Sequence, residues 1–205
     1  ERREDGLMTR TRLRPLPSGK IEPARALFFG LSLAAAGLGL LAWKTNFLAF
    51  FMTALTVALY ILAYTPLKKV TPQTTWIGAA AGATPPLIGW AAASGSLPFN
   101  AWVLFAIQFL WQIPHFLAMF WMHREDYARA GFQVMPVVDR TGGLTAYQIA
   151  LHSFTMLLAS LVPSLCGMAG ANYGVGALIL GTTYLGLGMK ASWTLAAVDT
   201  RRLFL

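Results

Sequence analysis

The sequence predicts an all-α protein, a polytopic bundle of transmembrane helices. Aliphatic, aromatic and cysteine residues make up 56% of its 205 residues and only 12% are charged, against about 25% in ordinary soluble domains. Six long apolar runs each approach the roughly 20 residues that a helix needs to cross a bilayer. The charged residues are collected in the segments between these runs. An ordinary soluble domain is therefore excluded, and six membrane-spanning helices are expected.

The six runs follow one another as the expected helices, joined alternately by short and long connections. They cover residues 24–43, 46–64, 75–93, 99–121, 145–167 and 172–190. Pro23 predicts the start of the first helix, because a proline at the first helical position loses no hydrogen bond. Pro66 predicts the end of the second. Pro85, Pro86 and Pro114 are expected to interrupt the third and fourth helices, which in a membrane requires protein or cavity water to satisfy the freed backbone groups.

Two stretches with G-x-x-x-G spacing, residues 78–82 and 170–174, predict close helix packing. Both lie in apolar surroundings, where glycines let two backbones approach each other.

Charge is confined to one predicted face of the membrane. An even number of crossings separates the charged segments from one another, and all the lysines and arginines except Lys44 lie in them or at their edges. By the positive-inside rule this face looks to the cytoplasm or to a mitochondrial matrix. Orientation and attraction to anionic lipid are sufficient reasons for the net charge of +8. Nucleic acid is therefore not expected as a partner.

The first charged segment has the residue types of a metal and diphosphate site. Glu1 and Asp5 are four residues apart, so on a helix their carboxylates project from one face, with Cβ atoms about 5–6 Å apart. Mg²⁺ prefers oxygen ligands and commonly bridges one or two carboxylates to phosphate oxygens. Arg10 and Arg14 follow, and guanidinium groups suit phosphate oxygens. The alternative is a solvated charge run beside the membrane.

Two further segments add charged side chains to the same face. Lys68 and Lys69 stand at the end of the second predicted helix, and Glu125 and Asp126 follow the fourth. The lysines alone could be a membrane-interface anchor, and the two carboxylates could simply pair with Arg124 and Arg129. Placed together on one face, these groups favour a diphosphate and Mg²⁺ site.

Four strings of residues carry a resemblance to the UbiA-type intramembrane prenyltransferases, and within them to the branch that acts on heme. The resemblance covers essentially the whole chain. The amino-acid sequence of residues 124–132 is similar to that of animal mitochondrial members of the family. The strings are Asp5-x-x-Met8-x-Arg10-Thr11-x-x-Arg14-Pro15-Leu16, Tyr64-Thr65-x-Leu67-Lys68, Trp111-Gln112-x-Pro114-His115-Phe116 and Asp126-Tyr127-x-x-Ala130-Gly131.

The resemblance implies a single integral-membrane prenyltransferase domain over residues 1–205, taken from a family with about nine helices around a central cavity. We therefore expect the domain to be truncated at both ends. The family's first acidic motif begins with an asparagine four residues before Glu1. Other branches have a carboxylate where this chain has Met122, so Glu125 and Asp126 are left to serve the second acidic motif.

The activity that the resemblance implies is transfer of a farnesyl group from farnesyl diphosphate to a vinyl group of protoheme IX. Water is added, and heme O and diphosphate are the products, a step toward the heme A of cytochrome c oxidase. The resemblance and the spacings together assign Mg²⁺ binding to Glu1, Asp5, Glu125 and Asp126, and diphosphate binding to Arg10, Arg14, Lys68 and Lys69. Contacts with heme or the prenyl chain are assigned to Tyr64, Trp111 and Phe116. The catalytic residues are expected to be Asp5, Asp126 and His115.

His115 has two interpretations. An ionisable side chain within an apolar run is by default a functional candidate, and the imidazole could ligate heme iron or manage a proton. It could equally bond a backbone carbonyl freed by Pro114.

Partners and location follow from the same resemblance. The expected partners are the two substrates, the lipid bilayer, heme A synthase and cytochrome c oxidase assembly proteins. The expected location is the mitochondrial inner membrane with the charged loops facing the matrix, with a bacterial plasma membrane as the alternative. Two rival functions stay open: prenylation of a quinone or chlorin precursor, and a non-catalytic membrane carrier.

Overall fold

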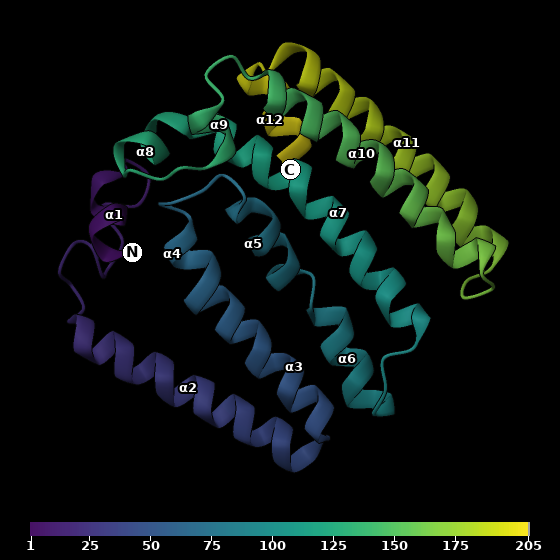
Figure 1. Cartoon of the computed structure of the whole chain (residues 1–205), viewed down its shortest axis with the longest axis horizontal. Helices are drawn as coiled ribbons and strands as arrows, with labels where there is room; N and C mark the ends of the chain where they lie inside the picture. Colours follow the sequence, from purple (N-terminus) through teal and green to yellow (C-terminus); the bar gives the residue numbers. More distant parts are fainter. Residues whose placement is uncertain (205) are drawn as a thin grey trace.

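Long helices run back and forth between the two ends of the molecule, in the order of the sequence (Figure 1). The computed structural model describes residues 1–204, and within that range every regular element is a helix. The long elements are α2 (Pro23–Lys44), α3 (Phe47–Ala58), α7 (Phe99–Met122), α10 (Gly143–Leu165) and α11 (Ala171–Thr194). The shorter ones are α1 (Arg2–Leu7), η1 (Leu59–Tyr64), α4 (Thr65–Leu67), α5 (Thr74–Gly82), α6 (Pro85–Ser94), α8 (Arg124–Arg129), α9 (Met135–Val138) and α12 (Ala197–Phe204).

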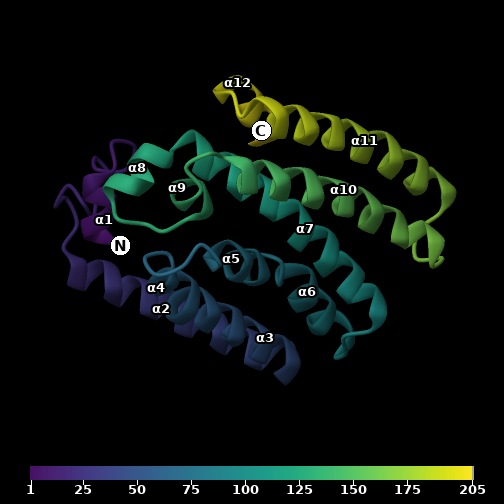
Figure 2. The same cartoon turned by 45° about the horizontal axis from the view of Figure 1, so that its top comes forward.

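The helices of the bundle pack side by side in sequence order, with α5 and α6 between α3 and α7. The order across the bundle is α2, α3, the pair α5 and α6, α7, α10 and α11, and Figures 1 and 2 both show it. The short helix α12 turns back from α11 and packs against α7. Such up-and-down packing is what short loops between antiparallel helices produce.

The predicted fold class, an all-helical membrane bundle, is confirmed. Within residues 1–204, four helices are long and apolar enough to cross a membrane: Pro23–Lys44, Phe47–Leu67, Phe99–Met122 and Gly143–Leu165. The second of these passes from α3 through the π-helical turn η1 into α4. The number of six spans is not confirmed and stays a prediction.

The third predicted helix is interrupted, as its two prolines indicated. α5 ends at Gly82 and α6 begins at Pro85. Neither Pro85 nor Pro86 has an N–H, so neither can bond the carbonyl four residues earlier. The Thr84 hydroxyl replaces one of the missing donors, at 2.8 Å from the Ala81 carbonyl oxygen.

The prediction that Pro114 interrupts the fourth helix is wrong. α7 continues from Phe99 to Met122 with Pro114 buried inside it. A single proline removes one backbone hydrogen bond, and a membrane helix packed between neighbours tolerates that loss. A pair of prolines removes two bonds in succession, and here only the pair breaks its helix.

Candidate functional site

The predicted site lies at the end of the bundle where the short helices gather. α1, α4, α8 and α9 all lie at this end, and the turns of the α2–α3 and α10–α11 hairpins lie at the other (Figures 1 and 2). A cluster of buried apolar residues supports the charged segments from below, with Phe120, Tyr127 and Phe132 at its centre. Three segments far apart in the sequence are thereby brought together.

Asp126 ties the first charged segment to α8. Its Oδ1 accepts the Thr9 N–H at 3.0 Å and its Oδ2 accepts the Arg10 N–H at 3.3 Å. Arg129 lies 3.2 Å from Oδ1 and also donates to the Thr9 hydroxyl at 2.8 Å. Asp126 thus pairs with Arg129, which was the alternative to a metal-binding role, whereas Arg124 stacks on the ring of Trp121, 4.6 Å from its centroid.

Ion pairs tie the first segment to the end of α4 as well. Lys68 pairs with Glu1, and Lys69 pairs with Glu4. Within the first segment, Arg14 lies 3.5 Å from the carboxylate of Asp5. Three of the predicted diphosphate-binding cations, Lys68, Lys69 and Arg14, therefore already face an anion of the protein.

Lys68 is the buried cation of this group, with 7% of its surface exposed. Its ammonium lies 4.5 Å from the centroid of the Tyr64 ring and 5.6 Å from that of Phe132. Its carbonyl accepts the Gln133 N–H at 2.7 Å. A buried lysine is costly unless it is paired and satisfied, and here Glu1 and the two ring faces supply the compensation.

Two carboxylates at this end, Asp126 and Glu4, have a pKa below its usual value. Partial desolvation acts to raise the pKa of Asp126, but the hydrogen bonds from Thr9 and Arg10 and the charge of Arg129 outweigh it, so this pKa lies below its usual value. The hydrogen bond from Lys69 lowers the pKa of Glu4. Both groups therefore stay anionic well into the acid range.

The carboxylates suit Mg²⁺ in their chemistry but do not converge on one point. Among residues 1–204, no three His, Cys, Asp or Glu side chains are close enough together to hold a metal ion. Glu1, the N-cap of α1, and Asp5 lie one turn apart, and their partners are side-chain cations rather than backbone groups. They offer the one or two carboxylates with which Mg²⁺ binds when phosphate supplies further oxygens. The oxygen donors fit the ion in that limited sense.

Glu125 shares a hollow of about 350 Å³ with Asp126, Thr9 and Arg129. Its side chain also lines a hollow of about 250 Å³ between α8 and α9, together with Arg124 and Arg140. Asp126, the next residue along α8, faces the first charged segment.

Deeper in the bundle, His115 lies between two aromatic rings. Its imidazole stacks on Trp111 with a centroid distance of 4.7 Å and on Phe204 at 4.6 Å. Its Nδ1 is enclosed and has no hydrogen-bond partner among the described residues. Seven residues separate it from the end of α7, a depth of about 10 Å. The predicted role of His115 is thus associated with this aromatic stack and not with the charged end.

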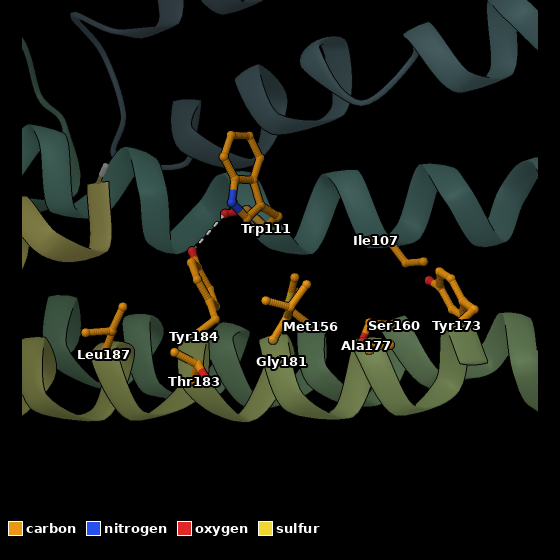
Figure 3. A pocket seen from close by; sticks show the side chains of 12 residues that line it. Ile107, Trp111, Met156, Ser160, Tyr173, Ala177, Gly181, Thr183, Tyr184 and Leu187 are labelled. Atoms are coloured by element: carbon orange, nitrogen blue, oxygen red, sulfur yellow. Dashed lines mark hydrogen bonds between the residues drawn. The ribbon is translucent and has the colours of Figure 1, made fainter. Parts of the chain in front are cut away.

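An apolar cavity of about 590 Å³ lies between α7, α10 and α11 (Figure 3). Trp111 and Tyr184 line it, and the Tyr184 hydroxyl donates to the Trp111 carbonyl at 3.4 Å. Phe116 lies nearer the charged end and packs against the apolar cluster beneath the site. The three predicted aromatic contacts therefore occupy different places: Tyr64 beside Lys68, Phe116 below the site and Trp111 on the cavity wall.

Several residues of the site could not be found from the sequence. Glu4 and Thr9 were not predicted, because their partners Lys69 and Asp126 are 65 and 117 residues away along the chain. Tyr127, which accepts a hydrogen bond from Arg10 at 3.4 Å, belongs to one of the family strings and carries no other sequence signal. The acidic pair next to it was the single local signal for this region.

The comparison with known proteins decides the family. The sequence matches the UbiA prenyltransferase family over residues 1–205. The chain belongs to this family. This UbiA prenyltransferase bundle carries most of its charged residues at one end, whereas Lys44 lies at the other, beside the α2–α3 turn.

Three bacterial relatives share the name protoheme IX farnesyltransferase. The one from Solibacter usitatus is 48% identical over 98% of this UbiA chain and 69% of its own length. The one from Synechococcus sp. is 48% identical over 87% of this chain and 54% of its own length. The one from Myxococcus xanthus is 43% identical over 92% of this chain and 64% of its own length. This chain thus spans between about half and two thirds of the relatives it matches. No solved structure matches it.

Proposed function

We propose that this chain transfers a farnesyl group from farnesyl diphosphate to a vinyl group of protoheme IX, with addition of water, to give heme O. The observation that carries the proposal is the charged end of the bundle, where Lys68, Lys69, Arg10 and Arg14 gather above an apolar core. The relatives' name supplies the identity of the two substrates.

The cations act on the leaving group. Lys68 and Arg14 exchange their carboxylate partners for diphosphate oxygens, which stabilises the negative charge that develops as the allylic C–O bond breaks. Bidentate contacts from arginine are well suited to these oxygens. Glu1, Asp5 and Asp126, with Glu125 beside Asp126, would hold Mg²⁺, which would supply positive charge at the diphosphate.

That exchange explains why the carboxylates and cations are paired beforehand. In the absence of diphosphate, Lys68 would otherwise be a buried cation without a counter-ion. When diphosphate arrives, Glu1 and Asp5 are released from Lys68 and Arg14 and become available to a divalent cation. The same exchange of partners thus prepares the cations to bind diphosphate and the carboxylates to bind the metal ion.

The apolar interior shelters the reacting carbons. A carbocation next to a prenyl chain survives only where stray water is excluded, and the Tyr64 ring beside Lys68 offers a face to positive charge. The cavity lined by Trp111 gives apolar room for a substrate, and His115 beside it is the proposed heme contact.

We place the charged end on the cytoplasmic side of a bacterial plasma membrane, because the relatives named above are bacterial and the basic residues lie at this end. This was the alternative to the mitochondrial inner membrane. Heme A synthase and cytochrome c oxidase assembly proteins remain the proposed protein partners.

The test is extraction and chromatography of hemes from cells that carry the complete gene as their only copy, with and without Asp5→Asn. We expect heme O in the first strain and little in the second. Equal amounts in both would remove Asp5 from the site. Offering protoheme and an aromatic acid as competing acceptors separates this activity from quinone-type prenylation, and absence of any farnesyl transfer would favour a carrier.

A further inference from the structure

The two glycines of the G-x-x-x-G stretch in α5 do not meet another helix backbone. Each receives a side chain from a different element. A methyl group at Gly78 would lie 2.5 Å from Cε2 of Tyr64, and one at Gly82 would overlap the carboxamide of Gln112, with Cδ and Nε2 at 2.9 Å. In the predicted packing motif, the space beside Gly78 is therefore filled by the Tyr64 side chain, and the space beside Gly82 by the Gln112 side chain.

The break after α5 leaves the backbone carbonyl of Gly82 without its helical hydrogen-bond donor. The carbonyl of Gly82 would bond the N–H of the residue four positions later, which is Pro86 and has none. The neighbouring Ala81 carbonyl is compensated by the Thr84 hydroxyl at 2.8 Å. Within residues 1–204 no side chain or backbone donor reaches the Gly82 carbonyl in the same way.

Gln112 brings unused donors to the same place. It is 4% exposed, and its carboxamide makes no hydrogen bond within the described part of the chain. The fully enclosed side-chain atoms without a partner there are those of His115, Gln148 and Ser153. The Gln112 amide is not among them, so a small part of its surface is left uncovered by protein atoms. A buried amide of this kind needs a polar partner.

The depth of this spot matches the chemistry of the proposed reaction. Gly82 lies one helical turn below Gly78, so Gln112 is about 6 Å deeper than the Tyr64 ring over which Lys68 lies. If diphosphate is bound at Lys68, the allylic carbon attached to it lies below Lys68, between the Tyr64 ring and Gln112. The vinyl carbon that takes up water is only two bonds further on.

We propose that the Gln112 carboxamide and the Gly82 carbonyl hold the water molecule that adds to the second carbocation, an inference that rests on the proposed function. The vinyl electrons form the C–C bond to the allylic carbon as its C–O bond breaks, which leaves a cation on the vinyl carbon next to the porphyrin. The held water forms a C–O bond to this cation, and its proton passes to the released diphosphate. Without that water, the adjacent CH₂ loses a proton and the product is an alkene, lighter by one water.

The test is mass analysis of the products made by the Gln112→Leu protein, expressed in membranes from its complete gene. We expect the ratio of hydroxylated to alkene product to fall by about tenfold, the effect of losing one or two buried hydrogen bonds. The KM for farnesyl diphosphate should stay unchanged. Gln108→Leu, the same substitution one turn away in α7, is the matched control and should leave the ratio at the wild-type value.

Gly82→Ala is the second variant, because the added methyl displaces the Gln112 amide without changing it. It should shift the ratio in the same direction, and it carries the test if Gln112→Leu does not accumulate in membranes. A wild-type ratio in the variant that accumulates would overturn the proposal, as would a loss of total transfer with the ratio unchanged. Failure of the proposed function is distinct: the unsubstituted protein would then make no farnesylated heme.

Discussion

Asp126→Asn should detach the first charged segment from α8. The carboxylate accepts the Thr9 and Arg10 N–H groups at 3.0 and 3.3 Å and lies 3.2 Å from Arg129. A hydrogen bond to a charged group contributes about 1.5–3 kcal/mol, and an exposed ion pair adds at most about 1 kcal/mol. Asparagine keeps one acceptor oxygen and loses the other, so the net loss is about 2 kcal/mol, or roughly 30-fold in the local opening equilibrium.

Limited digestion with trypsin measures this opening. Cleavage after Arg10 and Arg12 requires the segment to leave α8, since Thr11 between them is 1% exposed. When reclosing is faster than cleavage, the rate follows the population of the open form, so Asp126→Asn should speed cleavage by about 30-fold. Glu125→Gln is the matched control, because this neighbouring carboxylate makes no ion pair within residues 1–204. Equal rates in the Asp126 variant and the wild type, or equal acceleration by the control, would refute the reasoning.

Acid should open the same contact. The pKa of Asp126 lies below its usual value in the folded chain. Its contribution to stability is therefore fully present above the unfolded pKa of about 3.9 and is lost as the pH falls through the lower, folded pKa. The protection of the Thr9 and Arg10 amides from hydrogen exchange, relative to the same amides in an unfolded chain, should stay high through mildly acid solution and fall only in strong acid.

Three further predictions concern other parts of the chain. Asp139→Ala should lower the unfolding free energy in detergent by about 1–2 kcal/mol, because Asp139 accepts the Thr145 N–H and hydroxyl at 2.8 and 3.0 Å at the start of α10; an unchanged thermal midpoint would contradict this. Gly78→Ala should raise the KM for farnesyl diphosphate by about tenfold by displacing Tyr64 beneath Lys68, whereas Gly89→Ala, where nothing lies within 4 Å, should not. Lys68→Met should reduce diphosphate release by at least about 100-fold, with Lys20→Met as a control outside the site; a comparable effect of both would remove Lys68 from its role.

The sequence was sufficient for the features that depend on local patterns. Pro23 does begin α2, with Glu22 as its N-cap, and the apolar runs do form helices. The gathering of charged segments at one end followed from counting crossings. Pro114 shows the limit of this reasoning, because a buried proline is tolerated inside α7 for reasons of tertiary packing that no local pattern records.

The finer arrangement of the site depends on contacts between distant segments. The pairing of Glu4 with Lys69 and the capture of the Thr9 N–H by Asp126 need the folded bundle to bring their helices together. The stretch with Gly78 and Gly82 was identified, but its spacing cannot say whether a backbone or a side chain fills the space beside each glycine. The sequence therefore predicted which groups meet more reliably than it predicted how they pair.

The most direct test of the central claim uses protein purified in lipid with farnesyl diphosphate and protoheme. Diphosphate release and heme O are measured together, for the wild type and for Arg14→Gln. The proposed site predicts that the two products form in equal amounts with the wild type and that both are lost together in the variant. Heme O formed at the wild-type rate by Arg14→Gln, or diphosphate released without any farnesylated heme, would contradict it.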